Sequence, residues 1–297
     1  MVTTGGDYIL HATAAGANIR GFFARTTGVV GTAARIHGTS PVVSAALGRL
    51  LTAGAIMGSM LKNDGELVSL QMKGDGPMGG LVVSCGPDCV VKGYPHNPRV
   101  DLPLNNKNKL DVAGAIGRGH LSVVRDLAVA PFSGIVELVS GEVAEDLTHY
   151  FAHSEQQPSS VGLGVLVKVA DKSILHAGGF IIQILPGCPP HIPEELERII
   201  SDLPPITTLM HHNYSPDDIA SRILGGFGLS IKEYRETRFG CNCSFDRTLA
   251  ALASLGRKEL TNILNEDGQA TLHCHFCKTD HHFDSHQIKG LLEEQTT

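Results

Sequence analysis

Aromatic residues and positive charge are scarce in this sequence. It contains no tryptophan, and Phe, Tyr and Trp together make up only 5% of its 297 residues. Proteins that bind single-stranded nucleic acid usually stack the bases on aromatic side chains, so this scarcity counts against that class. Basic residues are also outnumbered, with 24 Lys and Arg against 30 Asp and Glu, whereas phosphate binding usually requires clustered positive charge. We therefore expect no nucleic-acid partner.

An N-terminal signal and a long apolar segment are missing as well. Residues 1–10 contain no basic stretch followed by a continuous apolar one, which distinguishes them from a secretory signal. The longest apolar segment, 50–61, lies between Arg49 and Lys62 and is shorter than the about 20 residues that cross a bilayer. We therefore expect a cytoplasmic protein without a membrane partner.

The cysteines do not form the dense framework of a small secreted domain, because there are only seven in a long chain and their number is odd. They are better interpreted as reduced thiols or metal ligands. Four of them form two close pairs near the C-terminus, Cys241 with Cys243 and Cys274 with Cys277. The remaining three, which we interpret as ordinary buried or turn cysteines, are Cys85, Cys89 and Cys188.

Residues 1–184 alternate short apolar segments with turn residues, and 42% apolar residues overall can bury a sizeable core. A hairpin is predicted from segments 8–13 and 19–25, and Ser40 before Pro41 predicts the start of a buried helix that runs to Lys62. The fold class is therefore α+β, with an N-terminal mixed α/β domain built on a β-sheet core. Further strands are predicted at 67–73, 81–84, 90–93, 121–125, 135–139 and 162–169, and a further helix at 140–153.

A boundary is predicted at 185–190, where proline and glycine accumulate. Residues 185–237 then form a helical linker region, with helices at 192–203 and 217–224 and Ser215 as the cap of the second. These helices are short and polar, so their stability must come from packing on a neighbour. Residues 238–297, which hold both cysteine pairs, are predicted to form a small zinc-binding domain.

The two cysteine pairs supply four sulfur ligands, which suits one tetrahedral Zn²⁺. Their spacing differs from that of the usual zinc ribbon, which has two Cys-x-x-Cys pairs about 15 to 20 residues apart. A purely structural zinc, or a site that uses His275 or His281, are alternatives that the residues leave open. A third is a redox switch, because cysteines two or three positions apart can pair with each other when oxidised and so deny the metal its ligands.

The residues around these cysteines resemble the C-terminal signature of the bacterial redox-regulated 33 kDa chaperonin family. The matching motifs are Gly-Cys-Asn-Cys-Ser at 240–244 and Cys-His-Phe-Cys at 274–277. Asp246, two residues after Ser244, stands where we expect a glutamate in that family, which is a mild departure. The resemblance extends over essentially the whole chain, with further matching segments at 19–26, 45–49, 140–146 and 154–165.

The resemblance implies a substrate-binding N-terminal domain, a helical linker and a zinc domain, in a holding chaperone that uses no ATP and is not an enzyme. In that family the reduced form with zinc is inactive. Oxidation forms the disulfides Cys241–Cys243 and Cys274–Cys277, expels the zinc and loosens the linker. The exposed apolar surface then binds unfolding client proteins, and the oxidised chaperone is a homodimer.

The main alternative function is a thiol-disulfide oxidoreductase that uses Cys274 and Cys277. Such enzymes usually place a Cys-x-x-Cys at a helix start beside a βαβ unit and hold no metal there. Two other patterns are weaker. The glycine pattern at 74–79 precedes a strand rather than a helix, and the pairs His211-His212 and His281-His282 lie in polar sequence, where solvated histidines are common.

Overall fold

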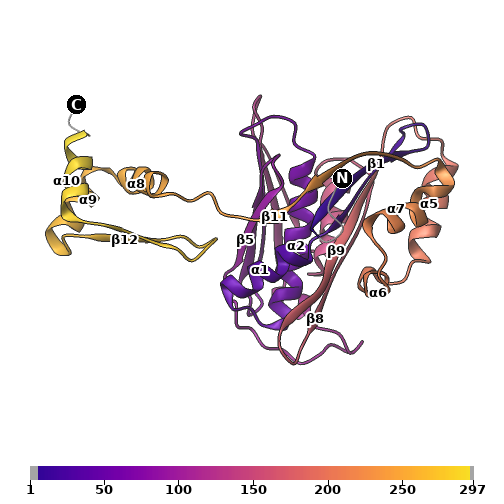
Figure 1. Cartoon of the computed structure of the whole chain (residues 1–297), viewed down its shortest axis with the longest axis horizontal. Helices are drawn as coiled ribbons and strands as arrows, with labels where there is room; N and C mark the ends of the chain where they lie inside the picture. Colours follow the sequence, from indigo (N-terminus) through magenta and orange to yellow (C-terminus); the bar gives the residue numbers. More distant parts are fainter. Residues whose placement is uncertain (1–5, 295–297) are drawn as a thin grey trace. The chain divides into compact units, whose positions relative to one another are not determined.

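In a computed structural model, the described residues, 6–294, fall into two compact units, one ending at Phe239 and the other beginning at Gly240 (Figure 1). Both units mix helices and strands, and the larger is built around two β-sheets. The predicted fold class, α+β with a sheet-rich core and a small cysteine-bearing C-terminal part, is confirmed.

The first unit contains a five-stranded and a six-stranded sheet. The first sheet has the order β10-β1-β2-β9-β8, and all its neighbours are antiparallel. The second has the order β11-β5-β4-β3-β6-β7. The strands of the first are β1 (Tyr8–Ala14), β2 (Ile19–Arg25), β8 (Ser159–Lys168), β9 (Ser173–Ile184) and β10 (Ser230–Glu236), and those of the second are β3 (Leu67–Gly74), β4 (Gly80–Cys85), β5 (Val90–Pro95), β6 (Gly119–Asp126), β7 (Phe132–Glu137) and β11 (Arg238–Phe239).

Helix α2 (Pro41–Ser59) is the centre of this unit, since it packs against strands of both sheets. Its small residues permit this close approach. A Cβ atom at Gly54 would lie 2.5 Å from Val83 Cγ1, and one at Gly58 would lie 2.4 Å from Cys85 Sγ. By length and composition α2 could cross a membrane, contrary to the shorter apolar segment seen in the sequence, but 94% of its apolar window is buried in the fold. The helix is thus used as a core helix.

Three further helices complete the layer between and beside the sheets. The first of them, α1 (Thr27–His37), was not predicted, because its glycine and threonine residues disfavour helix formation. Figure 1 shows α1 and α2 between the six-stranded sheet and the five-stranded one. The additional helices are α1 (Thr27–His37), α3 (Val112–Ile116) and α4 (Val143–His153).

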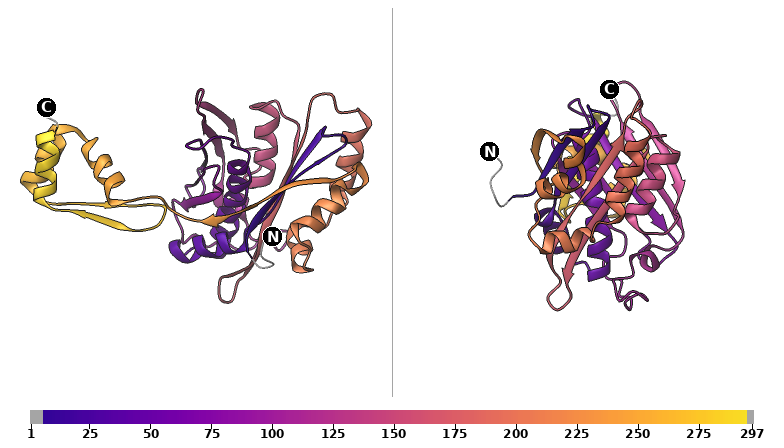
Figure 2. Two further views of the ribbon diagram at one scale, coloured as in Figure 1. Left: turned by 45° about the horizontal axis from the view of Figure 1, so that its top comes forward. Right: turned by 90° about the vertical axis from the view of Figure 1, so that its right-hand side faces the viewer.

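Helices α5 (His191–Ser201), α6 (Ile206–His211) and α7 (Pro216–Leu224) cover the other face of the five-stranded sheet (Figure 2). We call them the cover helices. Their buried side chains and those of the sheet form a second apolar core, and the predicted cap of α7 is present, since the Ser215 hydroxyl accepts from the Asp218 N–H. The core includes Leu10, Phe23, Phe180 and Ile182 from the sheet and Leu196, Leu209, Met210 and Ile223 from the helices.

The predicted helical linker region, 185–237, contains both predicted helices, as α5 and α7, but it ends in a strand. Residues 230–236 form β10, which pairs with β1 at the edge of the five-stranded sheet, and after one residue β11 pairs in parallel with β5 at the edge of the other sheet. We call Ser230–Phe239 the strap. Residues 185–237 thus belong to the same compact unit as 6–184. The edge strand β10 takes its backbone hydrogen bonds from β1, a strand of that unit.

Two polar clasps attach the strap and the cover helices to the sheet. In the first, Asp217 of α7 accepts hydrogen bonds from the hydroxyls of Tyr8 in β1 and Tyr234 in the strap, each at 2.6 Å. One carboxylate therefore joins a cover helix, a central strand and the strap. Charged acceptors make such hydrogen bonds stronger than neutral ones.

In the second clasp, His11 of β1 lies between a strap residue and α2. Its Nδ1 is 2.8 Å from Glu233 Oε1, and its Nε2 is 2.8 Å from Ser59 Oγ. The arrangement resembles a Ser-His-Glu triad, but Ser59 is buried, also bonds the Ile56 carbonyl, and lines none of the described pockets. Its role is therefore structural: it links the strap to the core helix.

The second unit contains three helices and a hairpin around a small core. The core side chains that are fully buried in it are Leu252, Leu260, Phe283, Ile288 and Leu291. So small a core contributes little stability by itself, and units of this size usually depend on a metal or disulfides. The elements are α8 (Phe245–Ala253), α9 (Gly256–Glu266), β12 (Ala270–His273), β13 (Asp280–Phe283) and α10 (Ser285–Glu294).

The His11 clasp predicts a pH dependence of stability. Burial lowers the pKa of His11 to about 4, against the opposing effect of Glu233. Because the folded pKa lies below the unfolded value, the unfolded state binds the proton more readily, and stability is lost as the pH falls from about 6.5 towards 4, by about 1–3 kcal/mol.

Thermal unfolding of the full chain between pH 7 and pH 4.5 measures this effect. The His11→Gln variant should lose less stability over that range than the unsubstituted protein, while substitution of the exposed His191 should change nothing. Equal pH dependence of the His11→Gln variant and the unsubstituted protein would show that His11 is not the titrating group.

Candidate metal centre

The first pair of predicted ligands, Cys241 and Cys243, directly follows the strap, with Gly240 between. The backbone around them is fixed by the start of α8. Ser244 caps that helix, its hydroxyl accepting from the Arg247 N–H at 3.2 Å, and Arg247 in turn donates to the Asn242 carbonyl at 3.3 Å. A helix cap of this kind holds the preceding residues in an extended conformation.

The second pair lies in the turn of the β12–β13 hairpin. The Cys274 N–H donates to the Thr279 carbonyl at 2.9 Å, and the Lys278 N–H donates to the Cys274 carbonyl at 2.8 Å. Lys278 has a φ of 63°, the left-handed conformation that closes the turn. The turn therefore presents Cys274 and Cys277 on one side of a tight loop.

The structure brings the four sulfur atoms together. All lie within 4.8 Å of one another, with 3.7 Å between the sulfurs of Cys241 and Cys274 and 3.3 Å between those of Cys243 and Cys277. In a tetrahedral zinc–thiolate site with bonds of about 2.3 Å, neighbouring sulfurs are about 3.8 Å apart. The cluster therefore has the dimensions of a four-sulfur metal site.

Burial and hydrogen bonds shift the pKa values of three of the four thiols. Burial and the neighbouring thiols raise the pKa of Cys243, and burial also raises that of Cys241. At Cys277 burial acts in the same direction, but hydrogen bonds from Thr279 and from other cysteines outweigh it and lower the pKa to about 6. Because thiols bind a metal as thiolates, a divalent ion bound here would displace the protons that these sulfurs carry.

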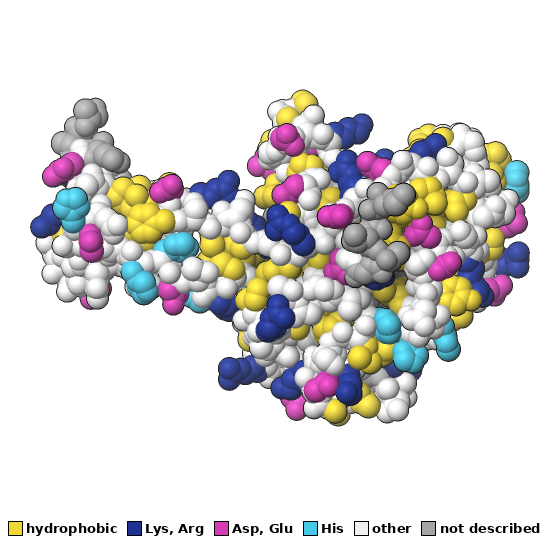
Figure 3. All heavy atoms as spheres, viewed as in Figure 1, with side chains coloured by type: hydrophobic (Ala, Val, Ile, Leu, Met, Phe, Trp, Pro, Cys, Tyr) yellow, Lys and Arg dark blue, Asp and Glu magenta, His cyan; other side chains and the backbone are white. Residues whose placement is uncertain are grey.

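No histidine belongs to the cluster. Among residues 6–294, the four cysteines are the group of potential ligands that could hold a metal ion. His273 pairs with Asp280 at 2.6 Å, and His282 lies 2.9 Å from the Thr271 hydroxyl, so neighbouring groups already engage these rings. Figure 3 shows several histidines at the surface of this unit, as expected for solvated side chains. His211 and His212 lie at the end of α6 in the first unit.

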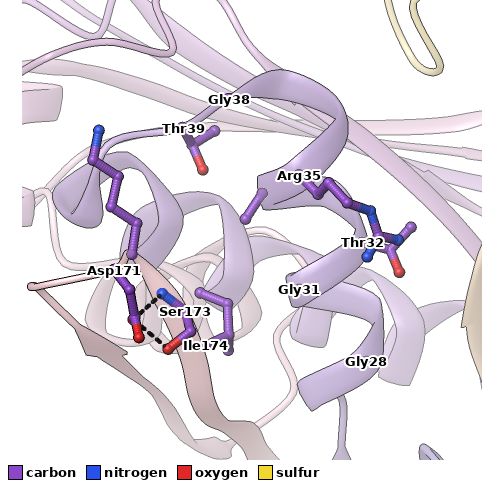
Figure 4. Close-up of a pocket in the computed structure, with 11 residues that line it drawn as sticks. Gly28, Gly31, Thr32, Arg35, Gly38, Thr39, Asp171, Ser173 and Ile174 are labelled. Carbon is purple, nitrogen blue, oxygen red and sulfur yellow. Dashed lines mark hydrogen bonds between the residues drawn. The ribbon is translucent and has the colours of Figure 1, made fainter.

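The other three cysteines, and one cavity, lie in the first unit, outside the four-sulfur cluster. Cys85 and Cys89 are buried in the first unit and Cys188 is half-buried there. A cavity of about 560 Å³ is lined by α1 and by the turn between β8 and β9 (Figure 4). Its one carboxylate, Asp171, already accepts from the Ser173 N–H and hydroxyl and pairs with Lys168. This acid therefore has a structural role in the turn.

The position of Cys274 and Cys277 bears on the oxidoreductase alternative. They lie in a hairpin turn beside two further thiols, whereas a catalytic Cys-x-x-Cys usually begins a helix. A helix N-terminus stabilises the thiolate of such enzymes through its dipole, and this source of activation is absent from the turn. The surroundings favour metal binding over thiol exchange.

The chain is similar to known proteins over nearly its whole length. The family model described as Hsp33 protein matches residues 7–284. The chain is 44% identical over 288 residues to the 33 kDa chaperonin of Acetivibrio thermocellus, covering 97% of each chain, and 45% identical over 286 residues to that of Agathobacter rectalis, covering 96% and 99%. The crystal structure of the 33 kDa chaperonin (heat shock protein 33 homolog) of Thermotoga maritima matches with a TM-score of 0.87 and 36% identity, over 98% and 99% of the two chains.

Removal of one sulfur ligand tests the metal centre. The Cys274→Ser variant should lose nearly all bound metal, because three sulfurs hold the ion much less tightly, and with it most of the about 10–16 kcal/mol that metal binding gives a small module. Metal content per chain and amide hydrogen exchange after Gly240 are the measurements. The Cys188→Ser variant is the control and should keep one metal ion. Equal metal content in both variants would place the ion elsewhere.

Proposed function

The chain belongs to the Hsp33 protein family, and on that premise we propose that it is a redox-regulated holding chaperone that works without ATP. In this proposal one Zn²⁺, held by Cys241, Cys243, Cys274 and Cys277, keeps the reduced protein inactive. Oxidation of the four cysteines releases the zinc, and the protein then prevents unfolding proteins from aggregating. The observation that carries the proposal is the cluster of four sulfurs immediately after the strap.

Zinc is the metal that this donor set favours. Thiolates are soft ligands that select zinc over magnesium or calcium, and four of them complete a tetrahedral shell with no open position. A closed shell supports folding rather than catalysis. Zinc also has no redox chemistry of its own, so any response to oxidants must come from the sulfurs.

Oxidation would remove the ligands in pairs. Two thiols and one molecule of hydrogen peroxide give one disulfide and two molecules of water, so two equivalents of peroxide consume all four sulfurs. We propose the pairs Cys241–Cys243 and Cys274–Cys277, in which each partner lies in the same short segment. Two short sulfur–sulfur distances, 3.7 Å and 3.3 Å, join opposite segments, and mapping of the disulfides distinguishes the two pairings.

Loss of zinc would then act on the strap. The second unit has a core of few side chains, so its folding depends on the metal, and Gly240 alone separates Cys241 from the strap. An unfolded second unit no longer fixes the end of the strap. The strap is an edge strand with a mostly exposed surface, and such segments open at low energetic cost.

Release of the strap and the cover helices would expose the apolar surface that binds clients. The face of the five-stranded sheet beneath α5, α6 and α7 carries Leu10, Phe23, Phe180 and Ile182, all fully or almost fully buried in the closed form. A contiguous apolar area of this kind binds the exposed core segments of unfolding proteins without sequence preference. We propose that the same exposed surface supports a homodimer of the oxidised protein, which acts in the cytoplasm.

The central experiment compares the reduced and the oxidised protein. After treatment with hydrogen peroxide at a mildly unfolding temperature, zinc release should approach one ion per chain, and suppression of aggregation of a heat-unfolded client enzyme should rise by about tenfold or more. A chromogenic zinc chelator and light scattering give the two readouts.

The reduced protein with bound zinc is the first control, and the Cys188→Ser variant, treated in the same way, is the second. The proposal is wrong if the reduced protein protects the client equally well, or if peroxide releases zinc without any gain in protection. Turnover of a disulfide substrate would favour the oxidoreductase instead.

The Asp217 clasp gives a second test of the same proposal. Asp217→Ala removes the acceptor for Tyr8 and Tyr234 and should weaken the attachment of α7 and the strap by about 1–2 kcal/mol, after a discount for the exposure of Tyr234. Activation should then require a lower temperature at the same peroxide concentration. Glu197→Ala, an exposed position on α5, is the control and should match the unsubstituted protein. An unchanged activation temperature for Asp217→Ala would mean that the clasp does not restrain opening.

A further inference from the structure

A second pair of cysteines flanks the loop between β4 and β5. Its sequence is Cys85-Gly86-Pro87-Asp88-Cys89, and each of the two cysteine residues is only 1% exposed. The pair belongs to the first unit and is not part of the four-sulfur cluster. From the sequence, both were interpreted as ordinary buried or turn cysteines.

Both thiols are directed at the loop that they flank. The Cys85 thiol donates to the Gly86 carbonyl at 3.4 Å and the Cys89 thiol to the Pro87 carbonyl at 3.7 Å. The Cys89 N–H donates to the Gly86 carbonyl at 3.1 Å and so closes a tight turn. Cys89 has a φ of 56°, a conformation that is costly for a residue with a side chain and that needs support from its surroundings.

The strap supplies that support. Arg235 donates from Nη1 to the Pro87 carbonyl at 3.1 Å, and the Thr237 hydroxyl donates to the Cys89 carbonyl at 2.8 Å. Immediately after Thr237, β11 pairs with the start of β5 at Arg238 and Val90. Two contacts of the strap therefore lie on this loop, and a third lies on the strand that follows it.

We propose that Cys85 and Cys89 are a second redox site, and that they form a disulfide only after the strap has left the loop. The strap contacts the Cys89 side of the loop, whereas the Cys85 sulfur lies beside Gly58 of α2, so the loop must also turn Cys85 away from α2. This inference rests on the proposed function, since release of the strap follows the loss of zinc. Peroxide oxidises one thiol to a sulfenic acid with loss of water, and the other thiol displaces a second water to form the Cys85–Cys89 bond. Each pair thus consumes one molecule of peroxide and yields two of water.

The closed form explains why the pair is silent before activation. Burial raises the pKa of both thiols, although Arg235 lowers that of Cys89 in part, so the reactive thiolate is scarce. Once the strap has left, water and peroxide reach Cys89, which no longer has to keep its left-handed conformation. The oxidised Cys89 then reacts with Cys85 as the loop turns that thiol away from Gly58 of α2. Three residues separate the cysteines, a span short enough for a local disulfide after the loop rearranges.

The disulfide would delay return to the inactive form. Thr237 and Arg235 bind carbonyls of the loop in its present conformation, and a new bond between its two ends changes that conformation. The strap then cannot return to its place until the disulfide is reduced. The site therefore prolongs the open state after the oxidant has gone.

Thiol mapping by mass spectrometry on the full chain tests the order of events. In the reduced protein with zinc, brief treatment with iodoacetamide should label Cys188, which is half-buried, but leave Cys85 and Cys89 unlabelled. After peroxide at the unfolding temperature, the peptide that contains both should carry neither label and should lack two hydrogens, which marks the disulfide.

The outcomes separate this inference from the proposed function. If the four C-terminal cysteines oxidise, zinc leaves and the client is protected while Cys85 and Cys89 remain thiols, the second redox site is wrong and the proposed function stands. If zinc and the four cysteines do not respond to peroxide, the proposed function itself fails.

The covering role of the strap has its own test in the reduced protein. Thr237→Val removes only the hydroxyl that binds the loop and should raise the labelling rate of Cys89 at least about fivefold while zinc stays bound. Lys232→Ala, an exposed position on the same strap, is the matched control and should leave the rate unchanged. Equal labelling rates in the two variants would overturn the covering role.

Discussion

Four sulfur atoms within 4.8 Å of one another are compatible with a folded chain only if protons or a cation neutralise them. The fold of the second unit depends on this constraint, because its core is too small to hold the two cysteine segments together without help. A metal ion that stabilises the unit is also a point of weakness. Any chemistry that removes the sulfurs as ligands removes the folding energy of the whole unit.

In the proposed mechanism, the strap transmits the loss of folding in the second unit to the larger unit. It completes the edge of both sheets, it is clasped through Glu233 and Tyr234, and it ends one residue before the first metal ligand. Its own residues are mostly exposed and polar, so little apolar burial holds it in place. A segment with this position is well suited to convert the state of the cysteines into exposure of the sheet beneath the cover helices.

Local sequence patterns predicted the elements that local physics determines. The hairpin of β1 and β2, the core helix α2, the capped helix α7 and the two cysteine pairs all follow from turn residues, caps, apolar periodicity or ligand spacing. Family resemblance supplied what these patterns did not, namely the chaperone class. The family itself is confirmed by the comparisons.

The features that the sequence did not predict depend on contacts between distant residues. The strap was included in the predicted helical linker region because five of the seven residues of β10 are polar or charged, and its pairing partner β1 lies far away in the sequence. The clasp of His11, Ser59 and Glu233 joins three segments far apart in the chain, and no spacing reveals it.

The central claim is that oxidation at the cysteines opens the strap and the cover helices while the rest of the first unit stays folded. Amide hydrogen exchange, followed peptide by peptide before and after peroxide treatment, tests it most directly. The account predicts that exchange rises strongly in residues 191–239 and in the second unit, while β2, β9 and α2 keep their protection. Unchanged protection of residues 191–239 in a protein that has lost its zinc and binds clients would contradict it.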